Sequence, residues 1–206
     1  MTSDNIEVEL RYKVHNTAET IASLEKLGIK NTGKKHLIDQ WFMPTAIRSM
    51  EAHEDWFNKD RGVAWRIRRT EQPDGSFKVE ATSKQLTDAN NHDTFIETDA
   101  GVNTYDEAMQ FVKDKGYYCW LTIDKTRYDF ASPKPEFEIV LDEIEGLAEK
   151  IGVGAALEVE FKGEATREEA LAQLDAFVAG AGINPGERFA RSLTVESMDA
   201  LANFGE

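Results

Sequence analysis

The fold is decided by the stretch IEVELRYKV at residues 6–14, in which apolar and charged side chains alternate without a break. Alternation with a period of two is typical of a β-strand, because successive side chains of a strand point to opposite faces of the sheet. Glu7, Glu9, Arg11 and Lys13 therefore share one face of this strand, opposite a face that is apolar or aromatic. Such a strand belongs to a sheet with one apolar face and one strongly charged face.

Further stretches repeat this alternation and lie between stretches with helical spacing. The predicted strands are 6–14, 37–43, 63–70, 77–84, 93–99, 118–129, 136–143 and 156–162. The predicted helices are 17–27, one that begins at 104, one that begins at 166 and a weaker one after 192. Hairpin connections such as Asp74-Gly75 imply a mainly antiparallel sheet, and the sequence therefore predicts an α+β fold.

The composition is that of a folded, acidic chain. It has 206 residues, a formal net charge of −14, 41% hydrophobic residues and 30% charged residues. A pI near 4.8 argues against a general nucleic-acid binder, which would carry a basic surface. No apolar run reaches the roughly 18 to 20 residues of a membrane span, and the N-terminus lacks the pattern of a signal peptide. The single cysteine, Cys119, suits a reducing compartment, so the expected location is cytoplasmic.

The charged residues gather by sign on different strands. Arg66 and Arg68 share a face of one predicted strand, whereas Glu158 and Glu160 share a face of another. One interpretation is that these charges only keep the wet face of an open sheet soluble. The other is a closed barrel of about eight strands, whose interior is just wide enough for side chains or one small ligand. Because the helices need the apolar face of the sheet, we favour the barrel with a charged interior.

Each sign of charge in such an interior has a preferred ligand. Guanidinium and ammonium groups bind phosphate oxygens. Neighbouring carboxylates repel one another unless a hard divalent cation such as Mg²⁺ or Mn²⁺ binds them. A polyphosphate chain that chelates such a cation satisfies both demands, and the residues therefore predict a site for a metal-bound polyphosphate.

The ordered motifs of the chain resemble those of the CYTH proteins, also called triphosphate tunnel metalloenzymes. The opening Glu7-x-Glu9-x-Arg11 looks like the family's ExExK signature, with arginine where lysine is usual. Later motifs follow in the family's order: HLIDQWF at 36–42, AWRIRR at 64–69, TSK at 82–84, IDKTRY at 123–128, IVLDEIEGL at 139–147 and LEVE at 157–160. The resemblance implies an eight-stranded antiparallel β-barrel, or tunnel, with a charged interior and flanking helices. We expect a single domain over 1–206, with 184–206 as a C-terminal tail or helix.

The resemblance also implies roles for individual residues. The implied metal ligands are Glu7, Glu9, Glu138, Asp142, Glu158 and Glu160. The implied triphosphate-binding residues are Arg11, Lys13, Arg66, Arg68, Lys84, Lys125 and Arg127. The implied catalytic residues are Glu158, Glu160 and Lys84, with Glu97 and Lys78 as weaker candidates for the site.

The family resembled here hosts more than one chemistry on one fold. The resemblance implies metal-dependent hydrolysis of inorganic tripolyphosphate, thiamine triphosphate or a nucleoside triphosphate, with Mg²⁺ or Mn²⁺ as cofactor. Two alternatives stay open: a class IV-type adenylyl cyclase that converts ATP to cyclic AMP and pyrophosphate, and a polyphosphate-binding protein without turnover. We favour hydrolysis because it needs neither a base pocket nor a positioned 3′-hydroxyl. The expected partner is the small-molecule substrate, with no nucleic acid and no membrane, and a homodimer is left open.

The remaining signals have structural interpretations. The four histidines lack metal-ligand spacing, and we expect them at the surface. Cys119 is expected to fill space in the interior rather than to act as a nucleophile. Trp65 and the segment 55–57 are expected to pack rather than to bind a base. The stretch 44–62 is expected to be a long loop with some local helix.

Overall fold

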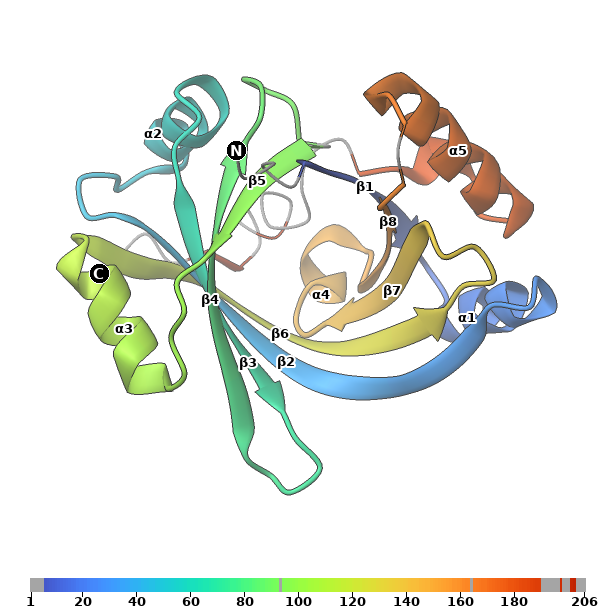
Figure 1. The fold of residues 1–206 in the computed structure, drawn as a ribbon, viewed down its shortest axis with the longest axis horizontal. Helices are drawn as coiled ribbons and strands as arrows, with labels where there is room; N and C mark the ends of the chain where they lie inside the picture. The colour runs from blue at the N-terminus through green and yellow to red at the C-terminus, as the bar shows by residue number, and fades with distance from the viewer. Residues whose placement is uncertain (1–5, 93, 164, 190–196, 198–200, 203–206) are drawn as a thin grey trace. The chain divides into compact units, whose positions relative to one another are not determined.

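The computed structural model of the chain describes residues 6–92, 94–163, 165–189, 197 and 201–202 (Figure 1). Its elements in chain order are β1 (Ile6–Val14), α1 (Thr17–Lys26), β2 (Lys30–Pro44), α2 (Met50–Glu54), the π-helix η1 (Asp55–Lys59), β3 (Ala64–Glu71), β4 (Phe77–Leu86), β5 (Thr94–Asp99), α3 (Tyr105–Asp114), β6 (Tyr117–Ala131), β7 (Phe137–Ile144), α4 (Ala148–Ile151), β8 (Ala155–Phe161), α5 (Arg167–Gly180) and the short 3₁₀ helix η2 (Pro185–Glu187).

The strands form a closed antiparallel barrel in the order β1-β5-β4-β3-β2-β6-β7-β8. The predicted α+β barrel is therefore confirmed, and each predicted strand is present. The largest difference is at β2, which begins at Lys30 rather than at residue 37. The added residues are mostly polar and exposed, so no apolar alternation signals a strand there. Thr32 and Lys35 of this extension both contact Asp129 of β6.

The chain divides into two compact units, and each is described by itself. Unit 1 consists mainly of His36–Asp124, and unit 2 consists of Glu7–Lys35 and Lys125–Glu196. The boundary between them falls inside β2 and inside β6. The expectation of a single domain over 1–206 is untested and stays a prediction.

The core of unit 2 lies between its strands and two helices, α1 and α5. Leu10 of β1 is opposite Val159 of β8, and both pack in one apolar cluster with Leu174 of α5. Helix α5 begins with a capping box, in which the Thr166 side chain accepts from the backbone N–H of Glu169 and the Glu169 carboxylate accepts from that of Thr166. The apolar face of these strands is therefore the face that the helices cover (Figure 1).

The core of unit 1 repeats this arrangement with α3 over β3 and β4. Trp65 and Ile67 of β3 pack with Ala108 of α3, and the rings of Trp65 and Phe111 meet edge to face at 4.7 Å. The expectation that Trp65 packs is therefore confirmed. The β3–β4 hairpin turns at Gly75, whose φ of +80° is a left-handed conformation that glycine adopts without strain.

The stretch between β2 and β3 contains the helical segments α2 and η1, which agrees with the expectation of some local helix there. His53 of α2 is only 2% exposed, so the expectation of a surface position is wrong for this histidine. Its ring stacks on Phe57 at 5.7 Å and lies 4.9 Å from the ring of Trp120. The segment has no clear hydrophobic period, and the sequence therefore did not indicate that His53 is buried.

Two further expectations were made about individual segments. Cys119 on β6 is partly buried, as expected, and burial raises the pKa of its thiol, although weaker hydrogen bonds oppose this. The weak helix expected after residue 192 falls mostly outside the described residues. In the part of the chain that the structure describes, no helix has the length and apolarity of a membrane span.

Candidate functional site

The inward face of unit 2 is charged, as the sequence predicted. Arg11 of β1 is directly opposite Glu158 of β8, and Glu9 is opposite Glu160. These residues alternate with Leu10 and the other members of the helix-covered apolar cluster, so they point to the other side of the sheet. In a closed barrel with helices outside, that side is the interior.

Asp142 of β7 is the most buried charge of this face, at 1% exposure. Its carboxylate accepts from Lys125 Nζ at 2.7 Å and from Arg127 Nε and Nη2, each also at 2.7 Å. Burial acts to raise the pKa of Asp142, but the charges of Lys125 and Arg127 prevail and hold the pKa below its ordinary value. One ionised carboxylate thus serves two cations, and its predicted role as a metal ligand stays a prediction.

Arg11 joins two further carboxylates of unit 2. Its Nε donates to Glu158 Oε2 at 2.9 Å, and its guanidinium also forms a close ion pair with Glu9. The other oxygen of Glu158 lies 3.7 Å from Arg127 Nη2, so the Arg11 group is continuous with the Asp142 group. Glu9 and Arg11 are 3% and 8% exposed, which means that these charges are stabilised mainly by one another.

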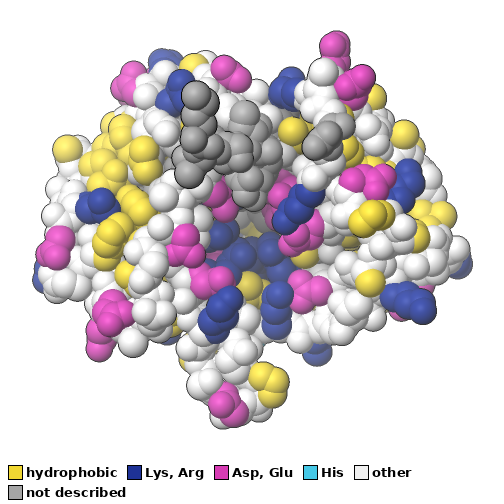
Figure 2. Space-filling view, in the orientation of Figure 1, with side chains coloured by type: hydrophobic (Ala, Val, Ile, Leu, Met, Phe, Trp, Pro, Cys, Tyr) yellow, Lys and Arg dark blue, Asp and Glu magenta, His cyan; other side chains and the backbone are white. Residues whose placement is uncertain are grey.

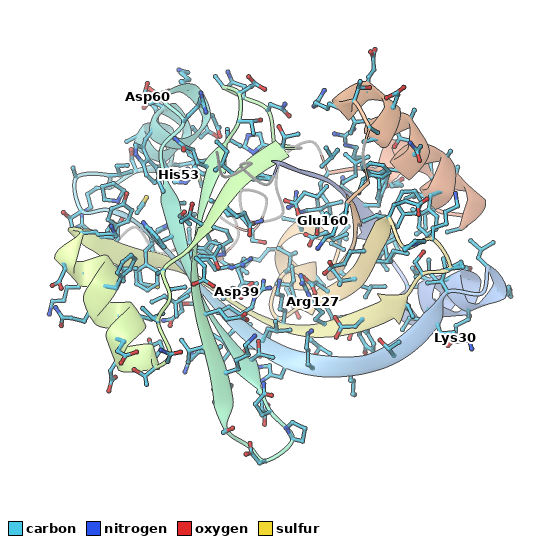
Figure 3. The ribbon with its side chains drawn as sticks, in the orientation of Figure 1. Lys30, Asp39, His53, Asp60, Arg127 and Glu160 are labelled. Atoms are coloured by element: carbon cyan, nitrogen blue, oxygen red, sulfur yellow. The ribbon has the colours of Figure 1, made fainter. Side chains whose placement is uncertain are left out.

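Glu160 and Glu138 form a third, more exposed group. They are directly opposite each other on β8 and β7, and Lys162 bridges them. Lys162 Nζ forms a close ion pair with Glu138 and lies 3.5 Å from Glu160 Oε2. Figure 3 labels Glu160 on β8 and Arg127 on β6.

The two other predicted site residues of β1 are Glu7 and Lys13. The side chain of Glu7 lies outside the described part of the structure, and its role as a metal ligand stays a prediction. Lys13 is partly buried, and its Nζ lies 5.7 Å above the ring of Phe189. A cation–π contact of this kind leaves the ammonium able to bind a phosphate.

Unit 1 contributes a second charged group, on β2 and β3. Arg68 donates from Nε and from Nη2 to the two oxygens of Asp39, each at 2.6 Å. Asp39, labelled in Figure 3, is directly opposite Arg68 and only 2% exposed. Sequence reasoning gave Asp39 no role, because its period-two neighbours on the strand, Leu37 and Trp41, are apolar and the pairing with Arg68 depends on the register between strands.

The other cations of unit 1 contact aromatic rings. Lys84 of β4 is opposite Glu97 of β5, forms a close ion pair with it, and lies 4.9 Å above the ring of Phe95. Arg66 is opposite Trp41 on β2, with its guanidinium 5.8 Å from the centre of that ring. The structure thus links Glu97, a weaker candidate, to a predicted phosphate-binding lysine.

Lys78, the other weaker candidate, lies apart from these pairs towards the hairpin. It pairs with Glu80 at 2.8 Å, and both side chains are exposed. Exposed pairs of this kind contribute little free energy. On the face drawn in Figure 2, acidic and basic side chains both reach the surface, so an exposed pair such as this one is not itself a sign of a site.

The carboxylates of unit 2 have the donor chemistry of a magnesium or manganese site. Glu9, Glu158 and Glu160 supply hard oxygen ligands from facing positions on β1 and β8. Among the described residues, no three acidic, histidine or cysteine side chains already converge as metal ligands. Instead these carboxylates turn towards Arg11 and Lys162. These oxygen ligands therefore fit Mg²⁺ or Mn²⁺. Binding of the ion would replace the contacts of the carboxylates with Arg11 and Lys162.

A closed antiparallel barrel with an interior of both charge signs defines the class of protein, and comparison identifies the family. The CYTH domain model matches residues 5–192, so this chain belongs to the CYTH family. Members of this family are triphosphatases or adenylyl cyclases and depend in general on a metal ion.

Solved structures share the fold. The PH1819 protein of Pyrococcus horikoshii superposes with a TM-score of 0.71 at 21% identity, covering 94% of this chain and 98% of that one. The PH1012 protein of the same organism gives 0.70 at 19% identity, with 92% and 98% covered. A Vibrio parahaemolyticus protein provisionally described as an adenylate cyclase gives 0.67 at 20% identity, with 94% and 98% covered. No curated protein matches this chain.

Proposed function

We propose that this chain is a metal-dependent phosphohydrolase that cleaves a linear triphosphate. The observation that carries the proposal is an inward barrel face, in a CYTH protein, that holds both cations and carboxylates, paired with one another. A triphosphate bound to a divalent cation is complementary to both groups. Inorganic tripolyphosphate is the simplest such substrate, and thiamine triphosphate and nucleoside triphosphates carry the same phosphate chain.

The cations of unit 1 are suited to hold phosphate. Arg68 and Lys84 are paired with Asp39 and Glu97, and the guanidinium of Arg66 lies near the ring of Trp41. A phosphate oxygen can take the place of the Glu97 carboxylate beside Lys84, because both are anionic acceptors of similar geometry. The bidentate pair of Arg68 with Asp39 keeps that guanidinium in a fixed orientation.

The carboxylates of unit 2 are suited to hold the metal and the attacking water. Glu9, Glu158 and Glu160 would bind Mg²⁺ or Mn²⁺, which neutralises phosphate charge and acidifies water when bound. Glu158 and Glu160 would also accept a proton from the water, which attacks the terminal phosphorus in line with the leaving oxygen. The bond from that phosphorus to the bridging oxygen breaks, and the products are orthophosphate and the shortened chain.

A product assay separates this proposal from its alternatives. Purified protein is incubated with tripolyphosphate, thiamine triphosphate or ATP, each with Mg²⁺ and with Mn²⁺. Orthophosphate release that requires the metal supports hydrolysis, whereas cyclic AMP and pyrophosphate from ATP identify a cyclase. Tight binding without any product identifies a polyphosphate-binding protein and overturns the enzymatic proposal.

Two substitutions test the proposed roles of Glu158 in metal binding and of Lys84 in phosphate binding. We expect Glu158→Gln to lower kcat on the order of 100-fold, because a metal-binding carboxylate is lost. Lys84→Gln should raise KM for tripolyphosphate about tenfold, because a charge-assisted hydrogen bond to phosphate is lost. Lys35→Gln is the control: it removes an exposed lysine paired with Asp129 at 2.9 Å, and both constants should stay unchanged. Full activity of Glu158→Gln would exclude that residue from the metal site.

A further inference from the structure

Two neighbouring strands carry the same sequence pattern. Strand β1 contains Glu7-x-Glu9-x-Arg11, and the chain repeats the spacing at Glu158-x-Glu160-x-Lys162, at the end of β8. The two strands are antiparallel, with Glu9 opposite Glu160 and Arg11 opposite Glu158. Each pattern therefore ends in a basic side chain that folds back on the glutamate two residues before it.

The two basic residues differ in exposure. Arg11 is 8% exposed and forms ion pairs with Glu9 and Glu158. If Arg11 moved away from these carboxylates, its buried positive charge would lose its counter-charges. Lys162 has a side chain that is 48% exposed, and its partner Glu138 is 52% exposed. An ammonium group at that exposure can move into water at little cost, because both states are solvated. Lys162 is thus the basic partner that can be exchanged.

We propose that Lys162 is an internal counter-ion that competes with the divalent cation for the Glu160 carboxylate. The ammonium lies between Glu138 and Glu160, where it screens the repulsion of two facing carboxylates. A metal ion that binds Glu160 through Oε2, the oxygen beside the ammonium, must displace Lys162. The inference rests on the proposed function, since it concerns the metal that the hydrolysis requires.

The competition has a defined consequence for affinity. A lysine that must leave Glu160 before the metal binds lowers the apparent metal affinity by the strength of its ion pairs. Exposed pairs of this kind change an equilibrium by about two- to five-fold. Removal of the ammonium should therefore tighten metal binding by that factor, and an arginine at the same position should restore the competition.

The test is a titration with Mn²⁺ in the absence of substrate, followed by calorimetry and by the electron paramagnetic resonance of free Mn²⁺. The proteins are the wild type, Lys162→Met, Lys162→Arg and Lys35→Met. The last removes the same charge from unit 2 at the exposed pair with Asp129. Lys162→Met should bind Mn²⁺ about two- to five-fold more tightly than the wild type, and Lys162→Arg and Lys35→Met should match the wild type.

The outcomes separate the two proposals. Equal Mn²⁺ affinity of the wild type and Lys162→Met, or weaker binding by Lys162→Met, overturns the counter-ion and leaves the hydrolase proposal intact. Equal tightening by Lys162→Met and Lys35→Met also overturns it, because general charge then explains the effect. Absence of Mn²⁺ binding in every protein overturns both proposals. Thermal melting of Lys162→Met checks that the fold is kept.

Discussion

The two units use the same residue types but connect them differently. In unit 1 two ion pairs join directly opposite residues on neighbouring strands: Asp39 with Arg68, and Lys84 with Glu97. In unit 2 the charges form a chain in which Asp142 serves two cations and Arg11 serves two carboxylates. In unit 2 the loss of one charged side chain therefore removes a partner from more than one other side chain.

The largest expected effect comes from removing the carboxylate shared by two cations. Asp142→Asn should lower the free energy of unfolding by about 3 to 5 kcal/mol, because the buried Lys125 and Arg127 lose their counter-charge. Asp39→Asn should cost less, because its partner Arg68 has a side chain that is 14% exposed and can be partly solvated. Urea denaturation of both variants measures the difference.

Equal losses for the two variants would remove the distinction between the chain of charges in unit 2 and the two ion pairs of unit 1. A double variant sharpens the point. Asp142→Asn combined with Lys125→Met should recover part of the lost stability, because one stranded cation is removed.

A second effect depends on pH and belongs to unit 1; a pKa lowered from 6.5 to about 4 corresponds to about 3 kcal/mol at most. Burial, aided by the charge of His92, lowers the pKa of His53 in unit 1 from 6.5 to about 4. The unfolded chain therefore binds a proton at a pH where the folded chain does not, and this contribution to stability is present above pH 6.5 and is lost as the pH falls towards 4. The pKa of Asp142 in unit 2 is already below its ordinary value, so Asp142 stays ionised in this window.

The measurement is urea denaturation at a series of pH values from 4.5 to 7. His53→Phe keeps the aromatic contact with Phe57 and Trp120 but cannot titrate. Its stability should fall less than that of the wild type as the pH is lowered. Parallel curves for the two proteins would contradict the neutral, buried state of His53.

The smallest effect on stability comes from His36 of unit 1, whose pKa shifts in the opposite direction to that of His53. A hydrogen bond with Asp124 and a second with Glu71 raise the pKa of His36 above 6.5, although partial burial opposes them. The stabilisation is therefore complete below pH 6.5 and is lost as the pH rises through the folded-state pKa. Because the ring is 36% exposed, we expect only about 0.5 kcal/mol.

This effect is measured as the difference in unfolding free energy between pH 6 and pH 9. His36→Gln should remove the difference, and Asp124→Asn should remove most of it, since Asp124 makes the larger contribution to the shift. A wild-type difference that survives in both variants would assign it to another group.

The sequence predicted what depends on local pattern. Alternating charge located the strands, and the threonine–glutamate capping boxes located α3 and α5. It predicted only some local helix where α2 and η1 lie and did not reveal α4, because these short helices have no sustained apolar period. It also placed the candidate residues on the inward face without their partners. The pairing of Asp142 with Lys125 and Arg127 depends on register between strands, which a single strand's pattern does not encode.

The raised thiol pKa of Cys119 has a practical consequence for experiments on this chain. Only the thiolate reacts quickly with maleimides and iodoacetamides, so a partly buried thiol of high pKa should label slowly near neutral pH. A cysteine introduced on the exposed side of α5 would then carry nearly all of a fluorophore or spin probe. Motion of this helix could then be followed without first replacing the native cysteine.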